Sequence, residues 1–472
     1  MIKFDSLFRV NSGLQVIAIV AIIVYLLFPN LSILSLFALI ICMHQFALLF
    51  NSIGSVVPIR YLFGAFMCLQ LLLGPTLAYN GLDSFQVNQY RMQIPEEVYF
   101  RYVIPAVICF ILGLHLNAGR LDGELIDQDR IEKYVSKNKD IAYIFIGIGF
   151  VSSIVAEFLS SELAFVFFLL GGFKFVGAFM IIIGNQQLRI TPLVIVYGSI
   201  IVSSLGMGMF HDLLTWIVFL GCVFAIKYKP GKVLKTGVAF SFVLLALAIQ
   251  QLKGDYREAT WKRGEEAGLE SLNKAYQEGQ ANNTFFSFRS LASSNLRFNQ
   301  GYIVTYIMKN VPEKEPYANG SELYKIVEAA VLPRIVAPNK LNAGDREFFM
   351  KYSGMRIAKG TSMGLSAVGD GYINFGVIGG CIFMFFLGLL YNTVIKGFKK
   401  YSASFPILIL FTPLVFYYPI RPDCELQTIL GHLAKSCFLI FVVFVFFKKY
   451  FIFYTSSTEK NIHPNPLVPS RL

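Results

Sequence analysis

Charged residues are scarce in this chain. Lys, Arg, Asp and Glu make up 15% of its 472 residues, whereas a soluble domain carries roughly 25%. Hydrophobic residues reach 55%. The net charge of +12 is spread over several loops and no compact basic domain carries it, which excludes nucleic acid as a partner. The composition therefore predicts a membrane protein that is surrounded by the lipid bilayer.

Motifs for metal or cofactor binding are also missing. The seven Cys include no CxxC pair, and the long polar segment 252–370 contains no Cys, which excludes a disulfide framework there. No P-loop and no HExxH helix is present, no His/Cys group has the spacing of zinc ligands, and the same segment lacks an Asp-x-Asp motif. We therefore expect no cofactor and no metal site, and any reaction would be metal-independent.

Long apolar runs separate the charged segments. Their length of about 20 residues matches the hydrocarbon core of a bilayer. They predict an all-α polytopic membrane protein with about twelve transmembrane helices. The expected spans are 14–28, 32–50, 61–79, 102–116, 141–159, 163–183, 191–209, 212–227, 234–251, 371–395, 405–420 and 429–447.

Lys and Arg are concentrated in alternate short loops. One orientation places the basic segments 117–140, 227–235, 396–400 and 448–449 on the same side. The short turns on the opposite side are almost free of positive charge. Because cytoplasmic loops of membrane proteins are enriched in Lys and Arg, both termini are predicted in the cytoplasm.

This topology divides the chain into four parts. Residues 1–251 hold helices one to nine, 252–370 form a large loop domain on the outer side, 371–450 hold the last three helices, and 451–472 are a polar cytoplasmic tail. The tail is expected to be disordered. The outer loop is the one insertion large enough to form a soluble domain.

Several arginines fall in the outer loop or at the outer ends of spans. The planar Arg side chain presents a fork of donors that suits phosphate and carboxylate oxygens. Five are expected to face a lipid-linked diphosphate: Arg257, Arg289, Arg297, Arg334 and Arg421. Arg289 and Arg297 are eight residues apart and could share one helix face. The alternative is that these arginines are solvated charges that balance nearby Asp and Glu.

Two further side chains on the same side are candidate bases. Asp370 precedes span ten between Gly369 and Gly371, where the backbone can turn tightly and a substrate can approach closely. Alternatively, Asp370 caps this span by accepting its first backbone N–H groups. His211 stands in the turn between spans seven and eight, where it could act as a base or as a capping residue.

A series of short motifs carries a family resemblance. In chain order they are Gly254-Asp255-Tyr256-Arg257, Leu332-Pro333-Arg334, Pro338-Asn339-Lys340, the run GDGYINFG from Gly369 to Gly376, and Gly379-Gly380. Over roughly residues 190–430 the chain resembles the O-antigen polymerase (Wzy-type) family of oligosaccharide repeat-unit polymerases, which is related to the O-antigen ligases. It departs from many relatives at Asp370, where they carry Glu, and at His211, where they carry Arg.

The resemblance implies a fold and an activity. The architecture would be GT-C-like, in a bacterial inner (cytoplasmic) membrane, with the large loop in the periplasm. The enzyme would be a glycosyltransferase that joins repeat units carried on undecaprenyl diphosphate into a surface polysaccharide, such as the O-antigen of lipopolysaccharide. Its substrate would be a polyprenyl diphosphate-linked oligosaccharide, and a chain-length regulator and a flippase would be protein partners. Arginines would neutralise the departing diphosphate, and a base would accept the proton of the acceptor hydroxyl.

Other functional classes remain open. An O-antigen ligase or another glycosyltransferase acting on lipid-linked sugars would share the architecture. A transporter or flippase of lipid-linked oligosaccharide would share the number of spans, although transporters place their polar groups near the middle of the membrane. The glycan profile of cells lacking the protein would separate these classes.

Overall fold

Helices make up the regular structure of the protein. The computed structural model describes residues 7, 11–83, 88–118, 127–184, 189–262, 264, 266–281, 287–334 and 336–452. In these ranges the one strand-like feature is an isolated bridge between Ile53 and Val56. A helix satisfies its own backbone polar groups, which is the condition for entering lipid. The predicted tail lies almost entirely outside the described residues.

Within the described ranges, ten helices are long and apolar enough to cross a bilayer, which confirms the predicted all-α, polytopic character. They are α2 (Ile33–Ser52), the run from α3 to η2 (Ile59–Leu82), α5 (Glu96–His115), α7 with η5 (Asp140–Phe158), α8 and α9 (Ser161–Gly171 and Phe173–Gly184), α10 (Ile190–Met207), α11 (His211–Tyr228), α12 with η6 (Lys232–Arg257 and Glu258–Lys262), α18 (Ser366–Ser402) and α20 (Leu426–Phe446).

The two remaining predicted spans correspond to shorter helices. The span 14–28 coincides with α1 (Asn11–Leu27). The span 405–420 is not one helix: it contains η7 (Pro406–Phe411) and α19 (Thr412–Val415), and turns follow up to residue 425. Ten helical residues rise only about 15–20 Å, well short of the roughly 30 Å of the hydrocarbon core. The polar turn 416–425 therefore begins inside the bundle.

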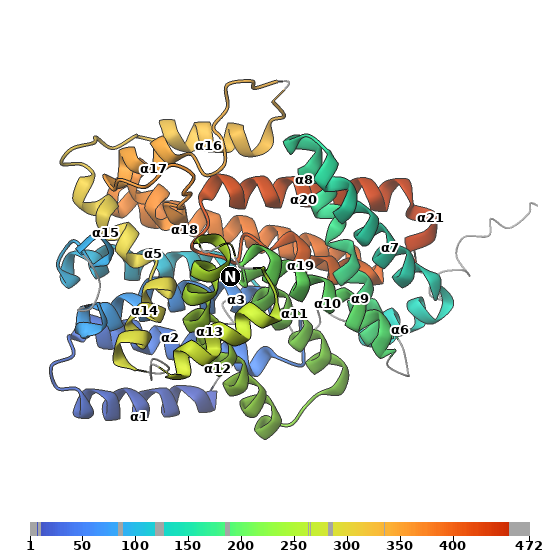
Figure 1. The fold of residues 1–472 in the computed structure, drawn as a ribbon, viewed down its shortest axis with the longest axis horizontal. Helices are drawn as coiled ribbons and strands as arrows, with labels where there is room; N and C mark the ends of the chain where they lie inside the picture. Colours follow the sequence, from blue (N-terminus) through green and yellow to red (C-terminus); the bar gives the residue numbers. More distant parts are fainter. Residues whose placement is uncertain are drawn as a thin grey trace, which may run out of the picture.

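Five helices occupy the segment between α12 and α18. They are α13 (Leu269–Ala281), α14 (Phe288–Phe298), α15 (Gly301–Asn310), α16 (Ser321–Val331) and α17 (Arg346–Ser353). In Figure 1, α14, α15 and α17 gather at the left end of the bundle, whereas α6 (Gln128–Lys137) and α21 (Lys448–Phe451) lie at the right end. This segment also contacts the bundle directly, because Asn295 Nδ2 donates to the Gly74 carbonyl at 3.0 Å.

The loops predicted on the cytoplasmic side share one end of the bundle. The Tyr134 hydroxyl donates to the Tyr450 carbonyl at 2.7 Å, and the Lys396 ammonium donates to the Leu116 carbonyl at 2.9 Å. Lys227 lies 3.4 Å from the Glu132 carboxylate. The three contacts join basic segments that are far apart in the sequence, as the predicted topology requires.

Helices α5 and α18 cross closely near this same end. A Cβ added at Gly388 would lie 2.8 Å from Leu114 N, and one added at Gly113 would lie 3.0 Å from Leu389 N. Beside the crossing, the buried Arg60 donates to Asn392 Oδ1 at 2.8 Å. Glycines bring the two backbones together here, as is common where helices pack in membranes.

Helix α18 reverses direction at Gly376. This residue has φ +65° and ψ −158°, a combination that is essentially restricted to glycine. A Cβ on Gly371 would lie 3.4 Å from the Gly380 carbonyl, although nine residues of straight helix would separate them by about 13 Å. The segment Ser366–Phe375 therefore folds back on the remainder of α18. Asp370 lies on this short first segment.

Candidate functional site

A tight turn brings Arg257 to the junction of α10 and α11. Helix α10 ends at Gly208, whose φ of +61° is readily adopted by glycine. Arg257 Nε donates to the Gly208 carbonyl at 2.8 Å, and the Arg257 guanidinium lies 4.4 Å from the centre of the Trp261 ring. These contacts fix the guanidinium next to the start of α11, where His211 stands.

His211 forms part of a short hydrogen-bonded chain. Its Nε2 lies 2.8 Å from Asp212 Oδ1, which also accepts the Tyr417 hydroxyl proton. The His211 side chain keeps 35% of its surface exposed. When the His211 ring carries its N–H on Nε2, that N–H faces the Asp212 carboxylate. Nδ1, on the opposite side of the ring, is then the nitrogen that can accept a proton.

Arg421 stands beside this chain in the polar turn 416–425. Its guanidinium lies 3.0 Å from Asp423 Oδ2, and Gln70 Nε2 donates to Asp423 Oδ1 at 3.4 Å. Burial disfavours the charge of Asp423, but the guanidinium outweighs burial and holds the pKa of Asp423 below its ordinary value. Asp212 also interacts electrostatically with Arg421, so the two acidic groups share this cation.

Two further cations complete the group. Lys253 interacts electrostatically with Arg257, Arg297 and Arg421, and Arg257 also interacts with Arg297. We name Lys253, Arg257, Arg297 and Arg421 the cationic cluster. The sequence analysis did not select Lys253, although it lies four residues before Arg257 and therefore one turn away on the same helix face.

The other two predicted arginines lie elsewhere. Arg289 is exposed at the first turn of α14, about 12 Å along the helix from Arg297. Arg334 Nη2 donates to Asn342 Oδ1 at 2.5 Å, within the segment that follows α16. Of the five predicted arginines, Arg257, Arg297 and Arg421 interact electrostatically with Lys253.

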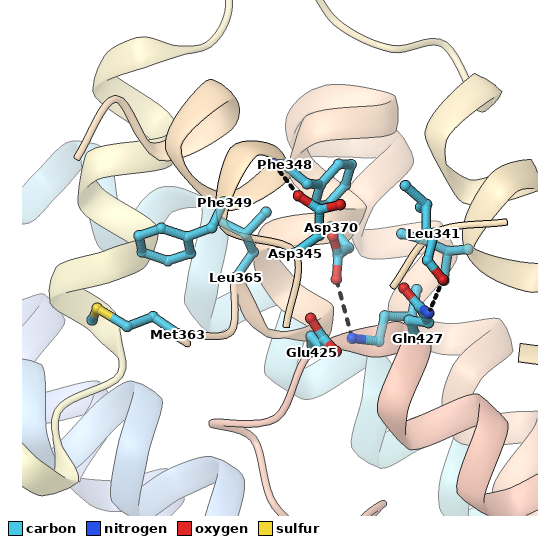
Figure 2. Close-up of a pocket in the computed structure, with 11 residues that line it drawn as sticks. Leu341, Asp345, Phe348, Phe349, Met363, Leu365, Asp370, Glu425 and Gln427 are labelled. Atoms are coloured by element: carbon cyan, nitrogen blue, oxygen red, sulfur yellow. Dashed lines mark hydrogen bonds between the residues drawn. The ribbon is translucent and has the colours of Figure 1, made fainter. Parts of the chain in front are cut away.

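Asp370 lines a separate cavity (Figure 2). The side chain is only 2% exposed, and its Oδ2 accepts a long hydrogen bond of 3.4 Å from Leu426 N. Asp370 Oδ1 is buried and has no hydrogen-bond partner among the described residues. Asp370 thus contacts the first turn of α20 and does not cap span ten, which corrects that alternative reading. In the first turn of α18, the Ser366 hydroxyl accepts a hydrogen bond of 3.3 Å from Gly369 N.

Glu425 joins two walls of the same cavity. Its Oε1 accepts from Gly344 N and from the Thr428 hydroxyl, both at 2.7 Å. Burial raises the pKa of the Glu425 carboxyl above its ordinary value. Gln427 Nε2 adds a bond of 2.9 Å to the Leu341 carbonyl. These bonds hold residues 336–345, which we name the wall loop, against the start of α20.

The cavity is narrow and mixed in character. Its free space is about that of one water molecule. Carboxylates face it from three sides, together with one amide, two rings and several apolar side chains. The lining residues are Ile326, Leu341, Asp345, Phe348, Phe349, Met363, Leu365, Asp370, Glu425, Leu426 and Gln427. In the sequence these residues are dispersed over about a hundred positions, so no local motif predicts the cavity.

The cationic cluster and the cavity both fall inside the part of the chain that a family model matches. The model of the family described as Domain of unknown function (DUF8712) matches residues 55–455. No curated protein and no solved structure matches the chain.

Proposed function

Because the chain belongs to the DUF8712 family, whose description assigns no activity, we propose a function from the geometry of the cationic cluster. The protein transfers a glycan from one polyprenyl diphosphate carrier to a hydroxyl group of the next carrier-linked repeat unit, and so acts as a polysaccharide polymerase. The donor's own diphosphate is the leaving group. The reaction takes place on the outer side of the inner membrane.

The convergence of like charges carries this proposal. Lys253, Arg257, Arg297 and Arg421 come from three chain segments, and their mutual repulsion costs free energy unless an anion balances it. Asp423 and Asp212 provide two of the negative charges. The remaining excess of about two positive charges matches the charge of a diphosphate diester, which guanidinium groups bind with paired N–H donors.

The neighbouring His211 supplies a base for the transfer. The acceptor hydroxyl oxygen attacks the anomeric carbon of the donor sugar, and the bond from that carbon to the diphosphate oxygen breaks. The diphosphate leaves with the bonding electrons and is stabilised by the cationic cluster. The hydroxyl proton passes to His211 Nδ1, while Asp212 on Nε2 stabilises the resulting imidazolium.

Asp370, which the sequence analysis proposes as the base, has a different environment. The charged group that acts on it is the Glu425 carboxylate, and its cavity holds little more than a water molecule. On this geometry we assign the proton transfer to His211. The role of Asp370 as a base stays a prediction.

One observation favours a second candidate function. The broken helix formed by η7 and α19 ends in the polar turn 416–425 inside the bundle, and transporters place broken helices and polar groups at such a depth. A flippase of lipid-linked oligosaccharide would use the cationic cluster for binding without any chemistry. A ligase would share the chemistry and differ only in its acceptor.

Purified protein in detergent separates these functions, because transport across a membrane cannot register in micelles. With a polyprenyl diphosphate-linked repeat unit as the sole substrate, we expect a ladder of longer glycans and release of polyprenyl diphosphate. His211→Ala and Arg257→Lys should each lower turnover by about 100-fold or more and leave the elution profile unchanged. Arg356→Lys, an exposed arginine of the same outer loop, is the matched control and should keep full turnover.

Two results would count against the polymerase. Binding of the lipid-linked substrate without any glycan ladder would favour the flippase. Normal ladders from both His211→Ala and Arg257→Lys would show that the cationic cluster is a solvated surface and that the transfer occurs elsewhere.

A further inference from the structure

The cavity around Asp370 is built for a ligand that donates hydrogen bonds. Asp370 Oδ1 is buried and has no hydrogen-bond partner among the described residues, whereas buried polar atoms are normally hydrogen-bonded. Glu425 and the Gln427 amide line the same space. A carboxyl group accepts hydrogen bonds and, when it is protonated, also donates one, so a hydroxyl group, which can donate and accept, is its natural partner.

The lining also excludes other ligands. The acidic side chains of Asp345, Asp370 and Glu425 line the cavity and no Lys or Arg does, so it offers no cation that could bind a diphosphate. Within the part of the chain that the structure describes, no group of three acidic, His or Cys side chains is arranged to hold a metal ion. The rings of Phe348 and Phe349 offer flat apolar faces. Carboxylates beside aromatic faces suit a neutral sugar, whose hydroxyl groups donate and whose C–H face packs on a ring.

We propose that this cavity is the subsite for the acceptor sugar, with Asp370 and Glu425 as hydroxyl acceptors and the wall loop as its cover. The inference rests on the proposed transfer reaction and assigns the second substrate of that reaction to a place separate from the diphosphate. Asp370 here binds the sugar and determines specificity.

The wall loop must move for a sugar to enter, since the closed cavity has room for about one water molecule. Two hydrogen bonds hold the loop to α20: Gly344 N to Glu425 and Gln427 Nε2 to the Leu341 carbonyl. Gly344 has φ +71°, and glycine allows the backbone to change direction at this point. The net contribution of one such hydrogen bond to stability is modest, so the hydroxyl groups of a sugar can replace both bonds.

The subsite and the cationic cluster share one short segment. Glu425 follows Arg421 by four residues, which span at most about 14 Å even when fully extended. A short oligosaccharide covers this distance. A repeat unit held beside Glu425 can therefore extend a further hydroxyl group towards Arg421 of the cationic cluster.

Two probes separate the two substrates. The neutral probe is the repeat-unit oligosaccharide released by mild acid from the host's own lipid-linked pool, and the anionic probe is inorganic diphosphate. Calorimetry on the purified full chain measures both. We expect Asp370→Asn and Phe348→Ala each to lower the affinity for the oligosaccharide at least 10-fold and to leave the affinity for diphosphate unchanged. Arg257→Lys should lower the affinity for diphosphate and leave the affinity for the oligosaccharide unchanged.

A matched control and a kinetic readout complete the test. Glu347→Gln removes an exposed carboxylate of α17 next to the cavity and should change neither affinity. In the transfer assay, Asp370→Asn should raise KM for the acceptor at least 10-fold with kcat reduced less than 3-fold, whereas a base would lose kcat. If Asp370→Asn does not fold, the affinity of Phe348→Ala for the oligosaccharide tests the subsite instead.

The outcomes distinguish this inference from the proposed function. Equal oligosaccharide binding by wild type, Asp370→Asn and Phe348→Ala would overturn the subsite, even if transfer activity is present. A loss of kcat without a change in KM for Asp370→Asn would also overturn it and would restore Asp370 as the base. The protein could also bind the oligosaccharide in a way that depends on Asp370 and yet show no transfer activity. That result would support the sugar subsite and refute the polymerase function.

Discussion

Replacement of Gly388 by Ala tests the close crossing of α5 and α18. The added methyl group would lie 2.8 Å from Leu114 N and still closer to the Phe110 carbonyl, both on α5. Ordinary contact requires about 3.4 Å or more, so the helices must separate by at least about 0.6 Å. A gap of 0.5–1 Å already forfeits a quarter to a half of the dispersion energy across a contact.

The expected cost is about 1–3 kcal/mol, the usual range for adding a methyl group to a filled interior. Thermal unfolding in detergent, followed by intrinsic fluorescence, should show a midpoint several degrees lower for Gly388→Ala. Gly397→Ala is the control on the same helix, because nothing lies within 4 Å of its added Cβ. There, alanine should be neutral or should stabilise the helix by up to about 1 kcal/mol.

Equal midpoints for Gly388→Ala and Gly397→Ala would refute the reasoning. That result would mean that the two helices do not approach each other as closely as the contacts at Gly113 and Gly388 indicate.

Three further predictions address other parts of the molecule. Gly376→Ala should lower stability by about 1–3 kcal/mol or more and abolish transfer, because only glycine suits the reversal of α18, as thermal unfolding and the transfer assay would measure. Lys340→Cys should react with an impermeant thiol reagent when the outer membrane alone is permeabilised, whereas Lys399→Cys should react only after the inner membrane is lysed. The reverse pattern would overturn the predicted topology. Asn392→Ala should cost about 2–3 kcal/mol of unfolding free energy, because Arg60 loses an acceptor at 2.8 Å inside the bundle, and an unchanged unfolding midpoint would contradict this.

Hydropathy revealed the membrane helices because lipid demands about 20 apolar residues for each crossing. It failed at 405–420, where the helical run begins at Pro406 and already ends at Val415; Pro419 and Pro422 stand in the turns that follow and do not allow the helix to continue. It also could not show that α18 contains a reversal, since Gly376 lies within an otherwise helical pattern and its φ depends on the packing of both segments.

The site was only partly accessible to sequence reasoning. Arg257, Arg297 and Arg421 were selected because of their side-chain chemistry and their position at one membrane face, and all three interact electrostatically with Lys253. Their partner Lys253 could have been found from its spacing on α12. The cavity could not, because the bond between Gly344 and Glu425 joins residues 81 positions apart and depends on tertiary packing.

Helix α12 connects bilayer thickness to the cationic cluster. Its two ends are attached to neighbouring helices through Lys235, which donates to the Ile53 carbonyl, and through Tyr256, which donates to the Leu205 carbonyl. Between these attachments, no residue from 236 to 254 is buried. Lipid must therefore surround this stretch, and the tilt of the helix follows the thickness of the hydrocarbon core. Because Lys253 and Arg257 stand at its outer end, turnover in vesicles should pass through an optimum as the acyl chains of the lipid are lengthened.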